Sequence, residues 1–159
     1  MPLDSRKSRH KERKMAYYTK LYFAVLIAFF AFDMVWLGLV ARTFYQKHLG
    51  FLLTPTTNWI AAVIFYLLFI LGIVVFVVLP GLEDNSLKTT LLRAALFGLI
   101  TYATYDLTNQ ATVKDWPLIV TLVDLVWGMV LSTIVSVAGF FVAKWLWCFF
   151  YWSIATRDG

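Results

Sequence analysis

Three aspartates, Asp33, Asp106 and Asp124, stand inside otherwise apolar segments of this chain. A carboxylate can bind a proton, a metal ion or an organic cation, and burying it is costly unless something neutralises it. No lysine or arginine lies in the part of these segments that holds the aspartates. All three carboxylates therefore cannot be ionised and unpaired, and we expect them to hold a cationic ligand or a proton, or to donate hydrogen bonds as neutral acids.

Aromatic and amide side chains accompany these aspartates at helical spacing. Trp36 follows Asp33 by three residues, and Trp127 follows Asp124 by three, so each pair shares one face of a helix. The four-residue pattern Asp-x-Val-Trp thus occurs twice, and we expect the two faces to meet across a bundle. The other candidates for the lining of a ligand cavity carry amide or phenol groups: Asn58, Tyr102, Tyr105 and Asn109.

The composition requires an apolar environment for most of the chain. Hydrophobic residues make up 61% of the 159 residues and charged residues only 14%, whereas soluble domains have about 45–50% and about 25%. Such a chain cannot cover a water-facing surface, and it suits a protein surrounded by lipid. The composition therefore predicts an integral, multi-pass membrane protein.

Four apolar runs are long enough to cross a bilayer as helices: residues 21–43, 58–79, 90–111 and 118 to about 142. We expect the second to end sharply at Pro80-Gly81. The third run carries the heaviest polar load, so we expect it to be the most enclosed helix. The predicted fold is an all-α, four-transmembrane-helix bundle with both termini on the same side and an aromatic interfacial extension at the C-terminus.

The chain divides into a basic N-terminal tail (1–20), the transmembrane domain (21–143) and an aromatic interfacial segment (144–159). Eleven of the 14 lysines and arginines fall on the side of the termini, which predicts that this side is cytoplasmic or its organellar equivalent. The basic tail is expected to attract anionic lipid headgroups. No nucleic-acid-binding module accompanies it, so nucleic acid is not a predicted partner.

The positions of the polar groups along their helices predict that they lie at similar depths in the membrane. At 1.5 Å per residue, Asp33 lies about 15 Å from the far end of the first run. Asp106 lies near the end of the third run and Asp124 near the start of the fourth, which is the same half of the membrane. We therefore expect a shallow cavity floored by Asp33 and walled by tryptophan and tyrosine rings, which would add cation–π attraction for a cationic ligand.

The remaining motifs exclude more than they identify. There is no catalytic motif, phosphate loop or dinucleotide fingerprint, and the single cysteine, Cys148, excludes an internal disulfide and a cysteine-based zinc site. We predict no cofactor and no metal. The leading hypothesis is a protein that binds or moves a small cationic or hydrogen-bonding ligand, or protons, with Asp33 and Asp124 as central acceptors. The alternatives are a non-catalytic subunit of a larger membrane complex and, third, an embedded enzyme acting on a lipid-like substrate.

Several ordered stretches resemble a bacterial family of small four-helix membrane proteins, the domain-of-unknown-function family number 2177. The resemblance covers about residues 16–143 and is carried by Phe32 to Gly38, Phe44-Tyr45, Asn58-Trp59, Phe65-Tyr66, Val77 to Pro80, Ala95 to Asn109, Trp116-Pro117 and Val123 to Gly128. It implies the four-helix fold in a bacterial inner membrane or a eukaryotic organellar membrane, and it implies no activity. The basic N-terminal and aromatic C-terminal extensions depart from the family pattern.

Overall fold

The computed structural model describes the backbone of residues 3–155 and the side chains of Ser8 and residues 11–148. Every regular element in this part of the chain is helical. The basic N-terminal segment is part of the first helix rather than a separate element, although the side chains of Arg6, Lys7 and Arg9 lie outside the described residues. The aromatic side chains that follow Cys148 also lie outside them.

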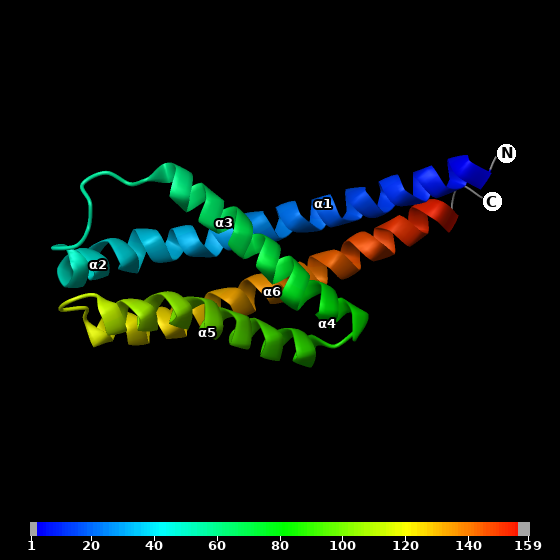
Figure 1. The fold of residues 1–159 in the computed structure, drawn as a ribbon. Coiled ribbons are helices and arrows are strands. Elements are labelled where there is room, and N and C mark those ends of the chain that lie inside the picture. Colours follow the sequence, from blue (N-terminus) through cyan, green and yellow to red (C-terminus); the bar gives the residue numbers. More distant parts are fainter. Residues whose placement is uncertain (1–2, 156–159) are drawn as a thin grey trace.

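Four long helical segments form the bundle. Figure 1 shows α1 (Leu3–Trp36) and α6 (Leu118–Ala155) running side by side in opposite directions, so that the two termini lie at one end. The helix α5 (Leu87–Thr112) packs along α6, and α3 (Trp59–Ile73) crosses the other helices obliquely. The last apolar run is therefore one continuous helix through its aromatic end.

The first helix continues farther than its apolar run. A five-residue π-helical segment, η1 (Leu37–Ala41), connects α1 directly to α2 (Arg42–Leu49). The helix therefore does not end with the apolar run near residue 43, since the polar residues of α2 are helical and form its exposed face. The end of α2 packs on the turn between α5 and α6, where Leu49, Trp116 and Val120 form a small apolar cluster.

The second span also continues past its predicted end. It passes from α3 through a second π-helical segment, η2 (Val74–Val78), into α4 (Leu79–Glu83). Pro80 lacks an amide hydrogen and its ring crowds the carbonyl group four residues earlier. The widened turn before it relieves this conflict, since the Leu79 amide bonds to Val74 O five residues back. Asn85, with a φ of 47°, ends the helical path instead of Pro80-Gly81.

The interhelical core combines an aliphatic stripe with one close helix crossing. Leu21, Val25 and Phe29 recur every four residues on α1 and are fully buried against α3 and α6. Between α5 and α6, a Cβ atom at Gly98 would overlap the carbonyl oxygen of Gly128. Small residues permit this backbone approach, as in other helix pairs packed within membranes.

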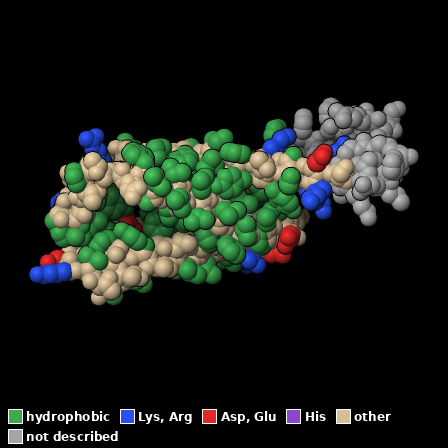
Figure 2. All heavy atoms as spheres, turned by 45° about the horizontal axis from the view of Figure 1, so that its top comes forward, with side chains coloured by type: hydrophobic (Ala, Val, Ile, Leu, Met, Phe, Trp, Pro, Cys, Tyr) green, Lys and Arg blue, Asp and Glu red, His purple; other side chains and the backbone are tan. Residues whose placement is uncertain are grey.

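The outer surface matches a lipid environment. Within the described residues, three helices are long and apolar enough to cross a membrane: Lys11–Leu49, Trp59–Glu83 and Leu118–Cys148. Figure 2 shows a broad band of hydrophobic side chains over the middle of the molecule, with lysines and arginines toward its ends. The helix α5 is of similar length, at 26 residues, but it carries more polar groups.

The prediction that this polar helix is the most enclosed is wrong. Tyr105 is 62% exposed, and Thr104, Thr108 and Thr112 are exposed along one face of α5. Each of these threonine hydroxyl groups donates to the backbone carbonyl four residues earlier, at 2.6–2.7 Å. Because their own helix satisfies these hydroxyl groups, they do not require a neighbouring helix to cover them.

Candidate functional site: a buried carboxylate cluster

The three aspartates come together from three helices. Asp33 of α1 is 5% exposed, Asp106 of α5 is 0% exposed and Asp124 of α6 is 7% exposed. The phenol of Tyr102 lies within electrostatic reach of all three, and Asp106 lies within such reach of Asp124. The ring of Tyr102 sits over Gly128, where a Cβ atom would overlap it. A glycine one turn after Asp124 thus makes room for this phenol between α5 and α6.

Asp33 is held by a side chain from the second span. The hydroxyl of Tyr66 on α3 donates to Asp33 Oδ2 at 3.2 Å. The indole N–H group of Trp127 on α6 is also close enough to interact with the Asp33 carboxylate. Asp33 therefore joins α1 to both α3 and α6.

Asp124 is held by a side chain that lies beyond the π-helical segment of the first span. The hydroxyl of Tyr45 on α2 donates to Asp124 Oδ1. Tyr45 follows Asp33 by twelve residues, which would place the two about 120° apart on a regular α-helix. The wide turn of η1 absorbs about one residue, so that the offset falls to about 20°. The π-helical segment therefore brings Tyr45 onto the face that carries Asp33.

The two Asp-x-Val-Trp motifs meet as expected. Trp36 and Trp127 stack with ring centroids 4.3 Å apart and an interplanar angle of 11°. The helices α1 and α6 that carry the two motifs run in opposite directions. An apolar crevice of about 370 Å³ lies beside the pair and is lined by both rings and by Leu122, Val123, Val126 and Val130.

Asp106 differs from the other two carboxylates. Neither of its oxygens has a hydrogen-bond partner among the described residues, although the side chain is fully buried. Asn109, one turn farther along α5, has a buried amide nitrogen that also lacks a partner. Buried polar groups in native proteins are nearly always satisfied, so these two side chains, like Ser132 and Ser136 on α6, are exceptions among the described residues.

A hollow is visible in the face drawn in Figure 2, near the end away from the termini, and the red of an acidic side chain is seen inside it. The sequence places Asp33, Asp106, Asp115 and Asp124 in that half of the molecule, and Asp115 lies on the exposed turn between α5 and α6. Arg42 lies in the first apolar segment of this half but is exposed, and the buried residues here include no lysine or arginine. The site is therefore an acidic region, and no lysine or arginine is buried with its carboxylates among the described residues.

Two of the sequence candidates lie elsewhere. Asn58 is exposed, and its side chain caps α3 by accepting a hydrogen bond from the Ala61 amide at 3.2 Å. Tyr105 points outward and makes an edge contact with Trp116, with ring centroids 6.0 Å apart. Depth alone suggested both residues, but the helix cap uses Asn58 and the rotation of α5 turns Tyr105 away.

Sequence reasoning missed Tyr45 and Tyr66, the two hydrogen-bond donors to the cluster. Tyr66 lies eight residues after the start of its span, which is about the depth of Asp33, so depth could have suggested it. Tyr45 could not be found in this way, because an uninterrupted helix would place it on another face.

A polar network near the turn between α5 and α6 was also missed: Trp116 Nε1 donates to Thr121 Oγ1, which donates to Gln110 Oε1, both at 3.1 Å.

Replacing Tyr45 by phenylalanine is expected to destabilise the protein by about 0.5–2 kcal/mol, the range measured for hydrogen bonds between membrane helices. The change removes only the hydroxyl group that reaches Asp124. The denaturation midpoint of purified Tyr45→Phe in detergent is compared with that of Tyr105→Phe, which loses an exposed hydroxyl group. Equal midpoints for the two variants would show that the Tyr45 bond does not stabilise the fold.

The fold and the cluster define a helical, multi-pass integral membrane protein with carboxylates buried between its helices. A comparison with protein families then gives the particular group: the chain belongs to the family of predicted membrane proteins designated DUF2177, whose pattern matches residues 18–141. The match includes all three buried aspartates and both stacked tryptophans. No curated protein and no solved structure matches the chain significantly.

Proposed function

We propose that this protein binds, and by extension moves, protons or a small cationic ligand at the carboxylate cluster formed by Asp33, Asp106 and Asp124. The observation that carries the proposal is the unpartnered, fully buried carboxylate of Asp106. An isolated ionised carboxylate in an apolar interior is unfavourable by several kcal/mol. A bound proton or cation removes that penalty. Among the described residues, Arg42 and Arg93 of the spans are exposed and neither carboxyl oxygen of Asp106 has a hydrogen-bond partner, which leaves the role to a ligand.

The geometry supports a division of roles that differs from our initial hypothesis. Asp33 and Asp124 each accept a hydrogen bond from a tyrosine on another helical segment, which favours a part in positioning. Asp106 and Asn109 have no such bonds and favour a part in binding. The stacked tryptophans, of which Trp127 is close to Asp33, suit a ligand with a positively charged or apolar portion.

Orientation in the membrane belongs to the same proposal. The α4–α5 turn lies toward the termini, and Lys88 follows it in the first turn of α5, whereas Lys114 lies in the turn at the opposite end. By the bias of positive charge, the termini face the cytoplasm or its organellar equivalent. The carboxylate cluster would then be nearer to the opposite surface, and the basic N-terminal residues would lie near anionic lipid headgroups.

A purely structural role is the second candidate, because the tyrosine–carboxylate bonds join separate helices and such bonds fix helix register. A subunit of a larger complex would need nothing more from these residues. The two readings differ in their prediction for titration. A binding site exchanges protons or cations, whereas interhelical hydrogen bonds stay closed while the protein is folded.

The test is infrared spectroscopy of the protein reconstituted in lipid. We expect a band from protonated carboxyl groups that responds to pH and to added guanidinium or tetramethylammonium. The baseline is the triple variant Asp33→Asn, Asp106→Asn and Asp124→Asn, which keeps acceptor oxygens for both tyrosines. A wild-type spectrum that matches this baseline under all conditions would reject the proposed function and favour the structural role.

A further inference from the structure

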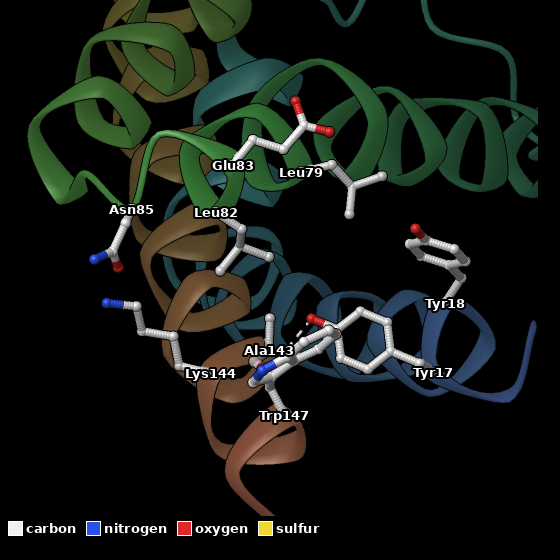
Figure 3. A pocket seen from close by; sticks show the side chains of 9 residues that line it. All are labelled: Tyr17, Tyr18, Leu79, Leu82, Glu83, Asn85, Ala143, Lys144 and Trp147. Atoms are coloured by element: carbon white, nitrogen blue, oxygen red, sulfur yellow. Dashed lines mark hydrogen bonds between the residues drawn. The ribbon is translucent and has the colours of Figure 1, made fainter. Parts of the chain in front are cut away.

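A second cavity lies at the other end of the bundle, where α1, α4 and α6 meet. It has a volume of about 410 Å³, which is within the range of small-molecule sites. Tyr17 and Tyr18 contribute from α1, and Lys144 and Trp147 contribute from α6. Figure 3 shows these side chains around the opening, below the end of α4. None of them takes part in the carboxylate cluster.

The position of this cavity corresponds to the headgroup level of a bilayer. Lys144 lies 26 residues after the start of α6, which is about 39 Å along the helix. That length equals the apolar core of a bilayer plus most of its headgroup regions, which together span about 40–45 Å. Tyrosine and tryptophan side chains, three of which line the cavity, are enriched at this level of membrane proteins.

The polar lining is balanced in charge. Lys144 supplies one positive charge, and Glu83, at the end of α4, supplies one negative charge. Asn85, in the turn after α4, adds an amide, and Figure 3 shows the Lys144 side chain extending toward the side of the cavity where Asn85 lies. Lys144 Nζ lies 4.7 Å from the centre of the Phe140 ring, which helps to keep its stem along α6.

The apolar lining completes the features of a lipid site. Leu79 and Leu82 line the cavity from α4, and the Tyr17 hydroxyl donates to the backbone carbonyl of Ala143 at 3.4 Å, joining α1 to α6 at its base. A lipid presents a polar headgroup and apolar chains at the same boundary. An amphipathic cavity at headgroup level therefore meets such a molecule whenever the protein is in a membrane.

We propose that this cavity binds the headgroup of a zwitterionic phospholipid, with the phosphate at Lys144 and Asn85 and the ammonium group toward Glu83. Equal and opposite charges in the lining favour a headgroup that carries both signs over one that is only anionic. The proposal concerns a different end of the molecule from the carboxylate cluster and does not depend on the function proposed there.

The experiment is native mass spectrometry of the full chain in detergent, titrated with dioleoylphosphatidylethanolamine or dioleoylphosphatidylglycerol. We expect the ethanolamine lipid to bind about fivefold more tightly or better. Lys144→Gln keeps the length of the side chain and removes its charge, and it should weaken this binding about tenfold, as expected for a lost charge-assisted hydrogen bond. Lys88→Gln, at a lysine outside the cavity, is the matched control and should bind as the wild type does.

A second pair of variants tests the selectivity itself. Glu83→Gln should move the preference toward the glycerol lipid, whereas Asp84→Asn, at the neighbouring residue outside the cavity lining, should not. Equal binding of the two lipids by the wild type, or equal effects of the Lys144 and Lys88 changes, would overturn the proposal. Soluble phosphoethanolamine that competes as well as the lipid at equal concentration would overturn the assignment to a membrane lipid.

Discussion

Replacing Gly98 by valine is expected to destabilise the protein by about 3 kcal/mol or more, the upper range for overpacking a closely packed interior. The reason is geometric, because any Cβ atom at Gly98 overlaps the backbone carbonyl of Gly128 on the facing helix. A backbone atom cannot move aside as a flexible side chain can. The helices α5 and α6 would have to separate, and they form the most extensive helix pair in the fold.

The matched control for this change is Gly38→Val. A Cβ atom at Gly38 meets nothing within 4 Å, so a substitution there should change stability by no more than about 0.5 kcal/mol. Stability is measured as the midpoint of unfolding in mixed detergent micelles. Equal midpoints for the two variants would mean that α5 and α6 do not approach as closely as the structure has them. Because Tyr102 packs over Gly128, separation of these helices should also disturb the carboxylate cluster.

Replacing Asp106 by asparagine is expected to remove most of the pH-dependent carboxyl signal while leaving the fold intact. Asp106 is fully buried without a hydrogen-bond partner, so it has the most to gain from binding a proton or cation. Asparagine has nearly the same shape and carries no charge, so unfolding in detergent should occur at the wild-type midpoint or above it. The measurements are infrared titration in lipid and the denaturation midpoint.

Asp115→Asn is the control, since Asp115 lies in the exposed turn between α5 and α6 and is expected to leave the buried signal unchanged. Asp33→Asn and Asp124→Asn should retain most of the signal, because Asp106 is unchanged in both and each asparagine can still accept the hydrogen bond from its tyrosine. A full signal in Asp106→Asn, together with its loss in Asp33→Asn or Asp124→Asn, would restore the original assignment of these two as the binding carboxylates.

The two proposed sites lie toward opposite ends of one bundle. The buried residues of the carboxylate cluster carry acidic groups and no positive charge, whereas the cavity at Lys144 has both signs and lies at headgroup level. Their separation means that a variant at one end can serve as a control for the other. Loss of lipid selectivity in Lys144→Gln should leave the carboxyl signal unchanged.

The sequence by itself determined the features that depend on composition and helical period. An apolar content of 61% with little charge requires a lipid-facing protein, and helix length and rise determine which residues lie at the same depth. The three aspartates could be grouped for this reason. The repeated Asp-x-Val-Trp pattern indicated that Trp36 and Trp127 would face each other, and they stack.

Only the tertiary structure decided which neighbours those residues have. The π-helical segment η1 changes the helix face on which each later residue lies. A calculation with a constant helical period therefore does not predict the bond between Tyr45 and Asp124. A similar turn before Pro80 lets the second span continue past a residue that normally ends a helix. The tertiary structure also determined which residues are buried. The polar face of α5 can stay exposed because its threonine hydroxyl groups bond to the backbone of the same helix. Asp106 has no partner among the described residues because no donor on a neighbouring helix reaches it. Such outcomes depend on the rotation of each helix against its neighbours, which depth along the sequence does not contain.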